Sequence, residues 1–277
     1  MTSRFRSPLA ALVFSGLALF ALGNGANAQT PAAASDKPLK IGVSAGPYGD
    51  ILREAAKLSA EQGVKAEIIE FTDWNQPNAA LQAGDIDLNN FQNRPYLANQ
   101  VKTRGYTIVA LDESILVPAG LYSKKYTGFA DIPAGSKIAI PNDPTNGGRA
   151  LLLFQKAGLI KLKPGSGLYA SVLDVAENPK NLKIVEIDAA QLPRSLDDVA
   201  AAFVSSNYAY LAGLQLKSAL LAETTLEEAK PYFTLVFAAR EDRKDDPRIA
   251  RFIAVYRSQP VKDFTLAKFN GSLIPTW

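Results

Sequence analysis

The residues best placed for chemistry form one stretch, in which an apolar segment is followed by prolines, amides, two glycines and an arginine. It runs from Ile138 to Gln155 and reads IAIPNDPTNGGRALLLFQ. We predict a buried strand over Lys137 to Ile140, a turn, and a helix over Ala150 to Ala157. The adjacent glycines let backbone N–H groups approach a ligand, and a helix N-terminus attracts anions. Because the Arg149 guanidinium can hold a carboxylate with two parallel hydrogen bonds, we predict a carboxylate-binding turn. The alternative is a capped helix with a solvated Arg149.

Composition removes several function classes. The 277 residues are 47% apolar and 21% charged, which is ordinary for a globular protein. The absence of cysteine and histidine excludes thiol nucleophiles, zinc sites built on these residues and triads with a histidine base. A formal charge of +3 without a basic run argues against a nucleic-acid partner. We predict no metal and no organic cofactor.

The N-terminus has the features of a secretory signal. Arg4 and Arg6 precede an almost wholly apolar run from Pro8 to Leu22, and Ala26 to Ala28 has the small-x-small pattern of a cleavage site. We therefore predict a signal peptide over residues 1–28 and a disordered tether over 29–38, in preference to a transmembrane anchor, for which the run is short. We expect a periplasmic protein without a lipid anchor, because no cysteine follows the run.

From Leu39 onward, short apolar strands alternate with amphipathic helices. Such alternation predicts an α/β protein with a mainly parallel sheet covered by helices. The first helix is expected to be capped by Asp50 and to end before Gly63. The other expected strands and helices are Leu39–Val43, Val64–Phe71, Ile86–Phe91, Tyr106–Leu111, Leu182–Ile187, Ala201–Val204 and Tyr232–Ala239 for strands, and Pro77–Ala83, Pro95–Arg104, Tyr208–Leu214, Pro247–Ser258 and Val261–Phe269 for helices.

The segments that follow the predicted strands are rich in aromatic, amide and hydroxyl side chains. Open α/β sheets bind ligands beyond the carboxyl ends of their strands. These segments contain few acid–base groups and one well-placed arginine, which indicates a pocket that holds a small zwitterion rather than transforming it. The segments are Ser44–Tyr48, Thr72–Asn75, Phe91–Tyr96, Pro141–Arg149 and Ser205–Tyr208.

Four long motifs resemble those of the NlpA/MetQ-type methionine-binding proteins of ABC importers, and the resemblance extends over Leu39 to Trp277. It implies a two-lobed periplasmic-binding-protein fold of type II, with the ligand in a cleft between the lobes. Residues 39–117 plus 234–277 would form lobe 1, and residues 118–233 would form lobe 2. The motifs are Gly84–Leu97, Pro141–Leu153, Val172–Leu182 and Gln191–Asp198.

The resemblance also implies a ligand site. The ligand's carboxylate would pair with Arg149, and its side chain would lie among Trp74, Phe91 and Tyr96, since a thioether packs well against aromatic rings. Packing in the core is the alternative role of these three rings. The complete predicted ligand-binding set is Arg149, Trp74, Phe91, Asn93, Tyr96, Asn146, Ser205 and Asn207.

Some pocket positions depart from the family pattern. Asn93 stands where the family commonly has histidine, and Ser205 stands where it has the asparagine that holds the ligand's ammonium group. Asn207 would need a register change to substitute for it. A polar position of the last strand corresponds here to Thr234 or Leu235, and the lipid-modified cysteine of the family is absent. Methionine is the leading ligand, with a related amino acid, a D-isomer or another small carboxylate as the alternative.

Two other function classes compete with a solute receptor that delivers its ligand to a membrane ABC permease. An enzyme could use Asp85 and Asp87, which share a face if they lie on a strand, although we expect them to order a turn. A protein-interaction module without a small ligand is the third class. The charged cluster from Arg240 to Asp246 is expected to be a solvated turn, with contact to a transporter as the alternative. We predict that the protein is not an enzyme.

Overall fold

The structure is a computed structural model that describes residues 37–223, 232–270 and 272–277. The predicted signal peptide and most of the predicted tether lie outside these ranges. At the end of the tether, the carbonyl of Lys37 accepts a hydrogen bond of 3.0 Å from Arg248. Within the described ranges, no helix has the length and apolar character needed to cross a bilayer.

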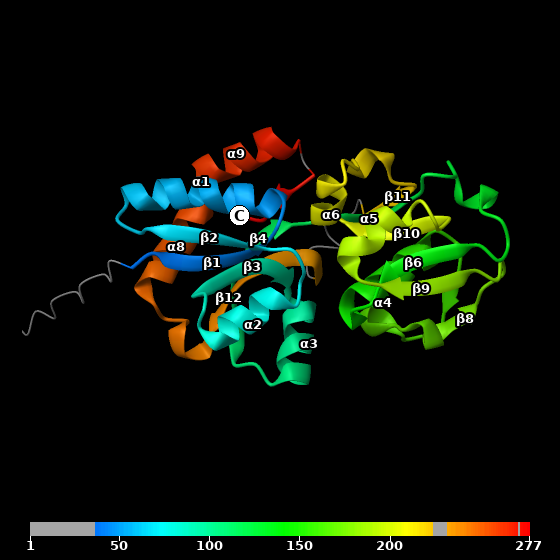
Figure 1. The fold of residues 1–277 in the computed structure, drawn as a ribbon, viewed down its shortest axis with the longest axis horizontal. Helices are drawn as coiled ribbons and strands as arrows, with labels where there is room; N and C mark the ends of the chain where they lie inside the picture. Colours follow the sequence, from blue (N-terminus) through cyan, green and yellow to red (C-terminus); the bar gives the residue numbers. More distant parts are fainter. Residues whose placement is uncertain (1–36, 224–231, 271) are drawn as a thin grey trace, which may run out of the picture. The chain divides into compact units, whose positions relative to one another are not determined.

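The first sheet has six strands in the order β13, β4, β12, β3, β1, β2 (Figure 1). Strand β1 runs parallel to β2 and β3, whereas β12 runs antiparallel to β3 and β4, and β13 runs antiparallel to β4. The strands are β1 Leu39–Ser44, β2 Ala66–Phe71, β3 Leu88–Asn93, β4 Ile108–Leu116, β12 Thr234–Arg240 and β13 Ile274–Pro275.

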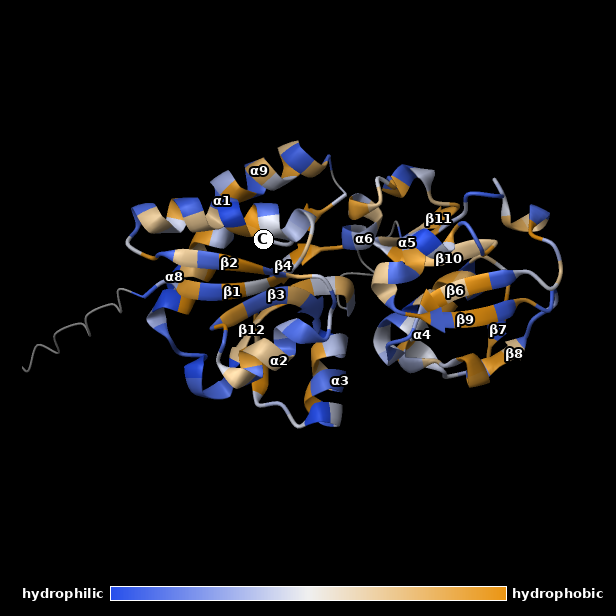
Figure 2. Ribbon diagram, in the orientation of Figure 1, coloured by the Kyte–Doolittle hydropathy of each residue, from blue (hydrophilic) through white to orange (hydrophobic). Residues whose placement is uncertain are grey.

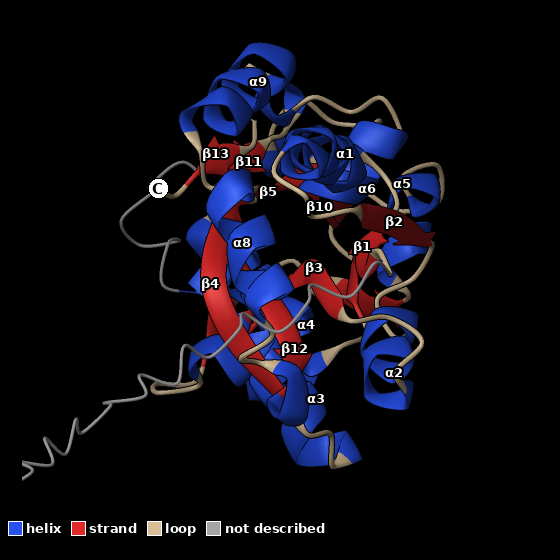
Figure 3. Cartoon of the chain, turned by 90° about the vertical axis from the view of Figure 1, so that its left-hand side faces the viewer, coloured by secondary structure: helices blue, strands red, loops and turns tan. Residues whose placement is uncertain are grey.

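Two buried apolar clusters attach helices to this sheet. One joins β1 and β12 to α1, α8 and α9, and the other joins β2, β4 and β12 to α2 and α3. In the first cluster the Phe237 ring packs edge-on against Phe252 at 6.4 Å and Tyr256 at 4.9 Å between centroids. Figure 3 shows α8 lying over the first sheet. The helices are α1 Pro47–Glu61, α2 Gln76–Ala83, α3 Arg94–Arg104, α8 Pro247–Tyr256 and α9 Gln259–Phe269.

The second sheet has five strands in the order β11, β5, β10, β6, β9. Strands β10, β6 and β9 are parallel, and β5 runs antiparallel to β10 and β11. Hydrophobic residues dominate β6 and β10 (Figure 2), as expected for strands covered on both faces. The elements of this part, with the separate pair β7–β8, are β5 Ala119–Tyr122, β6 Lys137–Pro141, α4 Pro144–Lys156, β7 Lys161–Leu162, β8 Val175–Glu177, β9 Lys183–Ile187, α5 Leu192–Ser195, β10 Ala201–Ser205, α6 Ser206–Leu211 and β11 Leu221–Ala222.

The predicted α/β class is confirmed, and every strand and helix expected from the sequence has a counterpart, although the ends of several elements differ. The expectation of a mainly parallel sheet is wrong for β4, β5, β11, β12 and β13, because periodicity locates a strand without giving the direction of its neighbour. The short strands β5 and β11 were not expected, since neither is long enough to show a pattern.

Two helices begin earlier than predicted. Helix α1 begins at Pro47 after Gly46, so Asp50 lies inside its first turn and pairs with Arg53 instead of capping the helix. Helix α4 begins at Pro144, where proline's missing N–H costs nothing. Its N-cap is Asp143, whose carboxylate accepts from the backbone N–H of Asn146 at 2.9 Å.

The two glycines of the central stretch therefore lie inside α4, and their role differs from the one predicted. A Cβ at Gly147 would come within 2.9 Å of the Pro141 carbonyl oxygen. A Cβ at Gly148 would collide with the backbone carbonyl of Leu168, in the short 3-10 helix Gly167–Tyr169. These glycines leave room for neighbouring backbone, and the N–H of Gly147 donates to the Asp143 carbonyl at 2.8 Å within α4 instead of pointing to a ligand.

Candidate functional site

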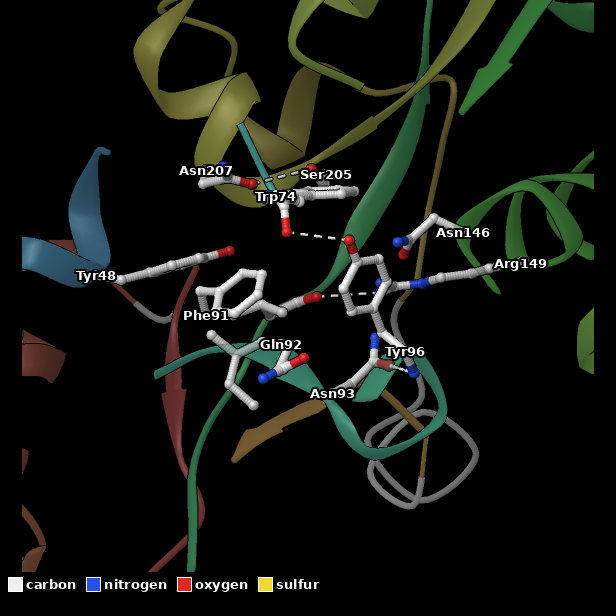
Figure 4. A pocket seen from close by; sticks show the side chains of 12 residues that line it. Tyr48, Trp74, Phe91, Gln92, Asn93, Tyr96, Asn146, Arg149, Ser205 and Asn207 are labelled. Carbon is white, nitrogen blue, oxygen red and sulfur yellow. Dashed lines mark hydrogen bonds between the residues drawn. The ribbon is translucent and has the colours of Figure 1, made fainter. Parts of the chain in front are cut away.

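One pocket brings together all eight predicted ligand-binding residues. Its walls come from both sheets and from the helices that follow their strands, as Figure 4 shows at close range. The lining residues are Tyr48, Trp74, Phe91, Gln92, Asn93, Tyr96, Val117, Asn146, Arg149, Ser205, Asn207 and Leu235. Convergence of residues so distant in sequence identifies this pocket as the candidate site.

Arg149 is the only charged side chain among the described residues that line the pocket, and it is 3% exposed. Its Nε donates to Glu223 Oε1 at 2.7 Å, and its Nη2 donates to Glu223 Oε2 and to the Val117 carbonyl, the latter at 3.0 Å. The Phe233 ring covers its guanidinium carbon at 3.6 Å. Arg149 is thus neither solvated nor in a turn, and the carboxylate that it holds with two parallel bonds in this structure is that of Glu223.

Part of the guanidinium remains for a ligand. A guanidinium has five N–H groups, of which Glu223 and Val117 take three. No described residue accepts a hydrogen bond from Nη1, which carries the other two. In Figure 4 the side chain of Arg149 extends toward Tyr96 and the centre of the pocket. A ligand carboxylate can therefore reach Nη1 while Glu223 stays in place.

Three aromatic rings form one wall of the pocket. Tyr96 lies edge-on to Trp74 at 6.4 Å and to Phe91 at 6.0 Å between centroids. The Tyr96 hydroxyl donates to the Trp74 carbonyl at 3.1 Å, which fixes the loop after β2 against α3. Trp74 also stacks at 5.1 Å on Tyr208 of α6. The wall is apolar, polarisable and held by its own contacts, which suits an aliphatic or thioether side chain.

Asn93 and Asn146 each place an amide in the pocket through a structural hydrogen bond. Asn93 caps α3, with its Oδ1 accepting from the Tyr96 backbone N–H at 2.8 Å. Asn146 Nδ2 donates to both carboxylate oxygens of Asp143 at 3.1 Å. A carboxylate only accepts, so the amide orientation of Asn146 is set, and its Oδ1 is the end that can accept from a ligand.

Ser205 and Asn207 lie at the junction of β10 and α6. The Ser205 hydroxyl donates to Asn207 Oδ1 at 3.0 Å, so the two side chains act as one unit. Asn207 is 1% exposed, and its Nδ2 has no hydrogen-bond partner. Trp74 Nε1 is likewise buried without a partner. A buried unpaired donor costs about 1–3 kcal/mol, and a ligand acceptor in the pocket would remove that cost.

The tyrosines around the pocket stay neutral at neutral pH. Burial raises the pKa of the Tyr48, Tyr96 and Tyr208 hydroxyls above the ordinary value. At Tyr48 the charge of Arg149 and the backbone of Asn207 oppose this rise without cancelling it. Tyr48 and Tyr96 line the pocket, and the hydroxyl of Tyr96 already donates to the Trp74 carbonyl.

Three lining residues, Tyr48, Gln92 and Val117, were not among the predicted pocket positions, and Leu235 was named only as one of two candidates for a polar position. Tyr48 was within reach, because it ends the segment after the first strand. Gln92 and Leu235 lie on β3 and β12, and their inward direction depends on the pairing of these two strands. Val117 lines the pocket at the point where the chain leaves β4 for β5, and no sequence signal marks that passage.

Asp85 and Asp87, the candidate catalytic carboxylates of the enzyme hypothesis, do not line the pocket. Asp87 accepts from the backbone N–H of Lys40 at 3.0 Å and lies 3.9 Å from Arg243, which is a structural role. The charged cluster from Arg240 to Asp246 forms a turn with internal ion pairs, among them Lys244–Glu241 and Arg243–Asp246 at 2.6 Å each. The expected solvated turn is what the structure contains.

Comparison with known proteins gives a consistent result. The family model "NlpA lipoprotein" matches residues 39–277. The D-methionine-binding lipoprotein MetQ of Yersinia pestis is 46% identical over 243 residues, which is 86% of this chain and 88% of the relative. The structure of a Burkholderia cenocepacia nutrient-binding protein bound to methionine is 46% identical, with a TM-score of 0.82 over 86% of this chain and 100% of the other. A periplasmic substrate-binding protein of an ABC transporter from Coxiella burnetii is 43% identical, with a TM-score of 0.81 over 86% of this chain and 100% of the other.

The fold and these likenesses define the class as a two-lobed α/β binding protein, as the sequence predicted. Its relatives are substrate-binding proteins. The chain belongs to the NlpA lipoprotein family.

The expectation of a protein without a lipid anchor is contradicted. The family and its relative from Yersinia pestis are named lipoproteins, which points to a lipid-anchored periplasmic protein. That expectation depended on a single observation, the absence of cysteine from the sequence.

Proposed function

We propose that this protein is the periplasmic solute-binding component of an ABC importer, which captures methionine and delivers it to a membrane permease. The observation that carries the proposal is the pocket around Arg149, where residues from both sheets converge. Guanidinium Nη1 supplies a carboxylate site, the amide oxygen of Asn146 supplies an acceptor for an ammonium group, and the aromatic wall supplies an apolar surface. The relatives named for methionine support that ligand.

The two lobes are assigned by their sheets. We infer that residues 39–117 with 234–277 form one lobe around the first sheet, and that residues 118–233 form the other around the second sheet. This division is supported by the pairing of β12 and β13 with β3 and β4. The chain would then cross between lobes at Val117–Pro118 and again between β11 and β12. Closure about two such crossings is a hinge motion.

We propose binding without catalysis. Among the described residues that line the pocket, none is an aspartate, glutamate or lysine, and the whole sequence has no histidine or cysteine. Positioned acid–base groups are what proton-transfer catalysis requires. A receptor that releases its ligand unchanged has no such requirement.

The specific ligand is tested by calorimetric titration of protein stripped of bound ligand. L-methionine is added first and D-methionine second, because the relatives' names include the D-isomer. We expect submicromolar binding of at least one isomer. Absence of both heat and thermal stabilisation with either isomer would contradict methionine as the ligand. A related amino acid or small carboxylate would then be the candidate, on the basis of Asn93 and Ser205.

A further inference from the structure

The pair formed by Arg149 and Glu223 is built into the site. The two side chains are 3% and 10% exposed, and both carboxylate oxygens of Glu223 take part. Oε2 also accepts from the backbone N–H of Ala119 at 2.8 Å. Glu223 thereby joins β5 to α4 and restricts the guanidinium to one orientation. A bidentate Arg–carboxylate pair is the geometry in which neither partner is free to rotate.

Glu223 lies where the chain leaves β11 toward β12. Arg149 contacts this passage and also the other passage between the sheets, from β4 to β5. It donates to the carbonyl of Val117 in the first passage and to Glu223 at the start of the second. Phe233, immediately before β12, covers the guanidinium face at 3.6 Å. The orientation of Arg149 is therefore defined by the hinge regions of the proposed fold, and Glu223 supplies the ionic part.

Glu223 changes the net charge that a ligand meets in the pocket. Arg149 alone would give the pocket a charge of +1 and attract any small carboxylate. Glu223 cancels that charge, and the carboxylate of Asp143, the N-cap residue of α4, accepts a hydrogen bond from Asn146 of the pocket. The described charges thus leave a site with no net positive charge, in a region that water screens weakly.

We propose that Glu223 is a specificity-determining residue, which positions Arg149 and makes the site select a zwitterionic amino acid over a carboxylate that lacks an ammonium group. This inference rests on the proposed function, and it names the ammonium group as the feature of the ligand that the site recognises. A neutral ion pair still offers Nη1 to the ligand's carboxylate. It gives no additional attraction to a net anion, whereas the ligand's ammonium group gains from the Glu223 carboxylate.

The test compares two ligands that differ only at the amine. L-methionine and its 2-oxo acid, 4-(methylsulfanyl)-2-oxobutanoate, are titrated into ligand-stripped wild-type protein and into Glu223→Gln. Wild type should favour methionine, and Glu223→Gln should reduce the ratio of the two affinities at least about tenfold, since the charge that balances Arg149 is removed from a weakly screened site. Glu177→Gln, in an exposed pair with Lys161, is the matched control and should leave the ratio unchanged.

A purely structural role for Glu223 gives a different result, because loss of Arg149 positioning weakens both ligands alike. An unchanged ratio in Glu223→Gln therefore overturns the proposal, as does a wild-type protein that binds the 2-oxo acid as tightly as methionine. Should Glu223→Gln fail to fold, Glu223→Asp is used instead, which should keep the ratio while lowering both affinities, and a changed ratio in that variant overturns the proposal. If wild type binds neither ligand, the methionine proposal fails, and leucine with 4-methyl-2-oxopentanoate is used for the same comparison.

Discussion

At the scale of single residues, Arg149 has two tasks that cannot be separated by one substitution. It offers Nη1 to the pocket, and it neutralises the buried carboxylate of Glu223. A buried ion pair contributes little net stability, yet removal of one partner leaves the other charge uncompensated. The residue that we propose binds the ligand's carboxylate is thus also required by the fold.

Arg149→Ala is expected to abolish measurable ligand binding and also to lower the free energy of unfolding by about 3–5 kcal/mol, because Glu223 remains buried without its partner. Chemical denaturation and titration of the same sample measure both effects. The double variant Arg149→Met with Glu223→Gln should recover much of the stability and none of the binding. A single variant that is as stable as wild type would show that the pair is not buried in solution.

The individual residues of the site were more predictable than their contacts. All eight predicted residues line one pocket, because positions after strand ends converge and because the resemblance supplied their motifs. The partnership of Arg149 with Glu223 could not be predicted, since it joins positions 74 residues apart through a segment without periodicity. The capping role of Asn93 was likewise hidden, as it depends on where α3 begins.

At the scale of elements, α4 carries the site, and its placement depends on its glycines. Gly148 has no room for a Cβ, because the backbone of Leu168 lies against it. Periodicity predicted which segments form strands and which form helices. It did not predict the residue at which α4 begins. Its first two turns contain proline, asparagine and two glycines, which are typical of a turn, and the packing of Leu168 overrides that local preference.

Gly148→Ala is expected to destabilise the protein by about 1–3 kcal/mol, through overpacking against the fixed backbone of Leu168. The sign of the stability change is informative, because a glycine-to-alanine change inside an unobstructed helix stabilises the protein by about 1 kcal/mol. Gly49→Ala in α1 is the matched control. Its obstacle is the end of the Glu70 side chain, which can rotate away. Equal stability changes for the two variants, measured by urea denaturation, would contradict this packing.

At the scale of the whole molecule, two sheets with different strand orders supply the walls of one pocket. The sequence predicted the α/β class from its alternation of strands and helices. It did not predict which strands share a sheet, because the return of β12 beside β3 and β4 is a contact between distant segments. The two-lobed fold was anticipated through the resemblance, and local patterns alone would not have shown it.

The most direct test of the proposed site is a crystal structure of the protein with L-methionine bound. The account predicts that the ligand's carboxylate lies within about 3 Å of Arg149 Nη1, that the thioether lies against Trp74, Phe91 and Tyr96, and that Glu223 still holds the other side of the guanidinium. Methionine bound in this pocket with its carboxylate away from Arg149, or bound at another place, would contradict the account.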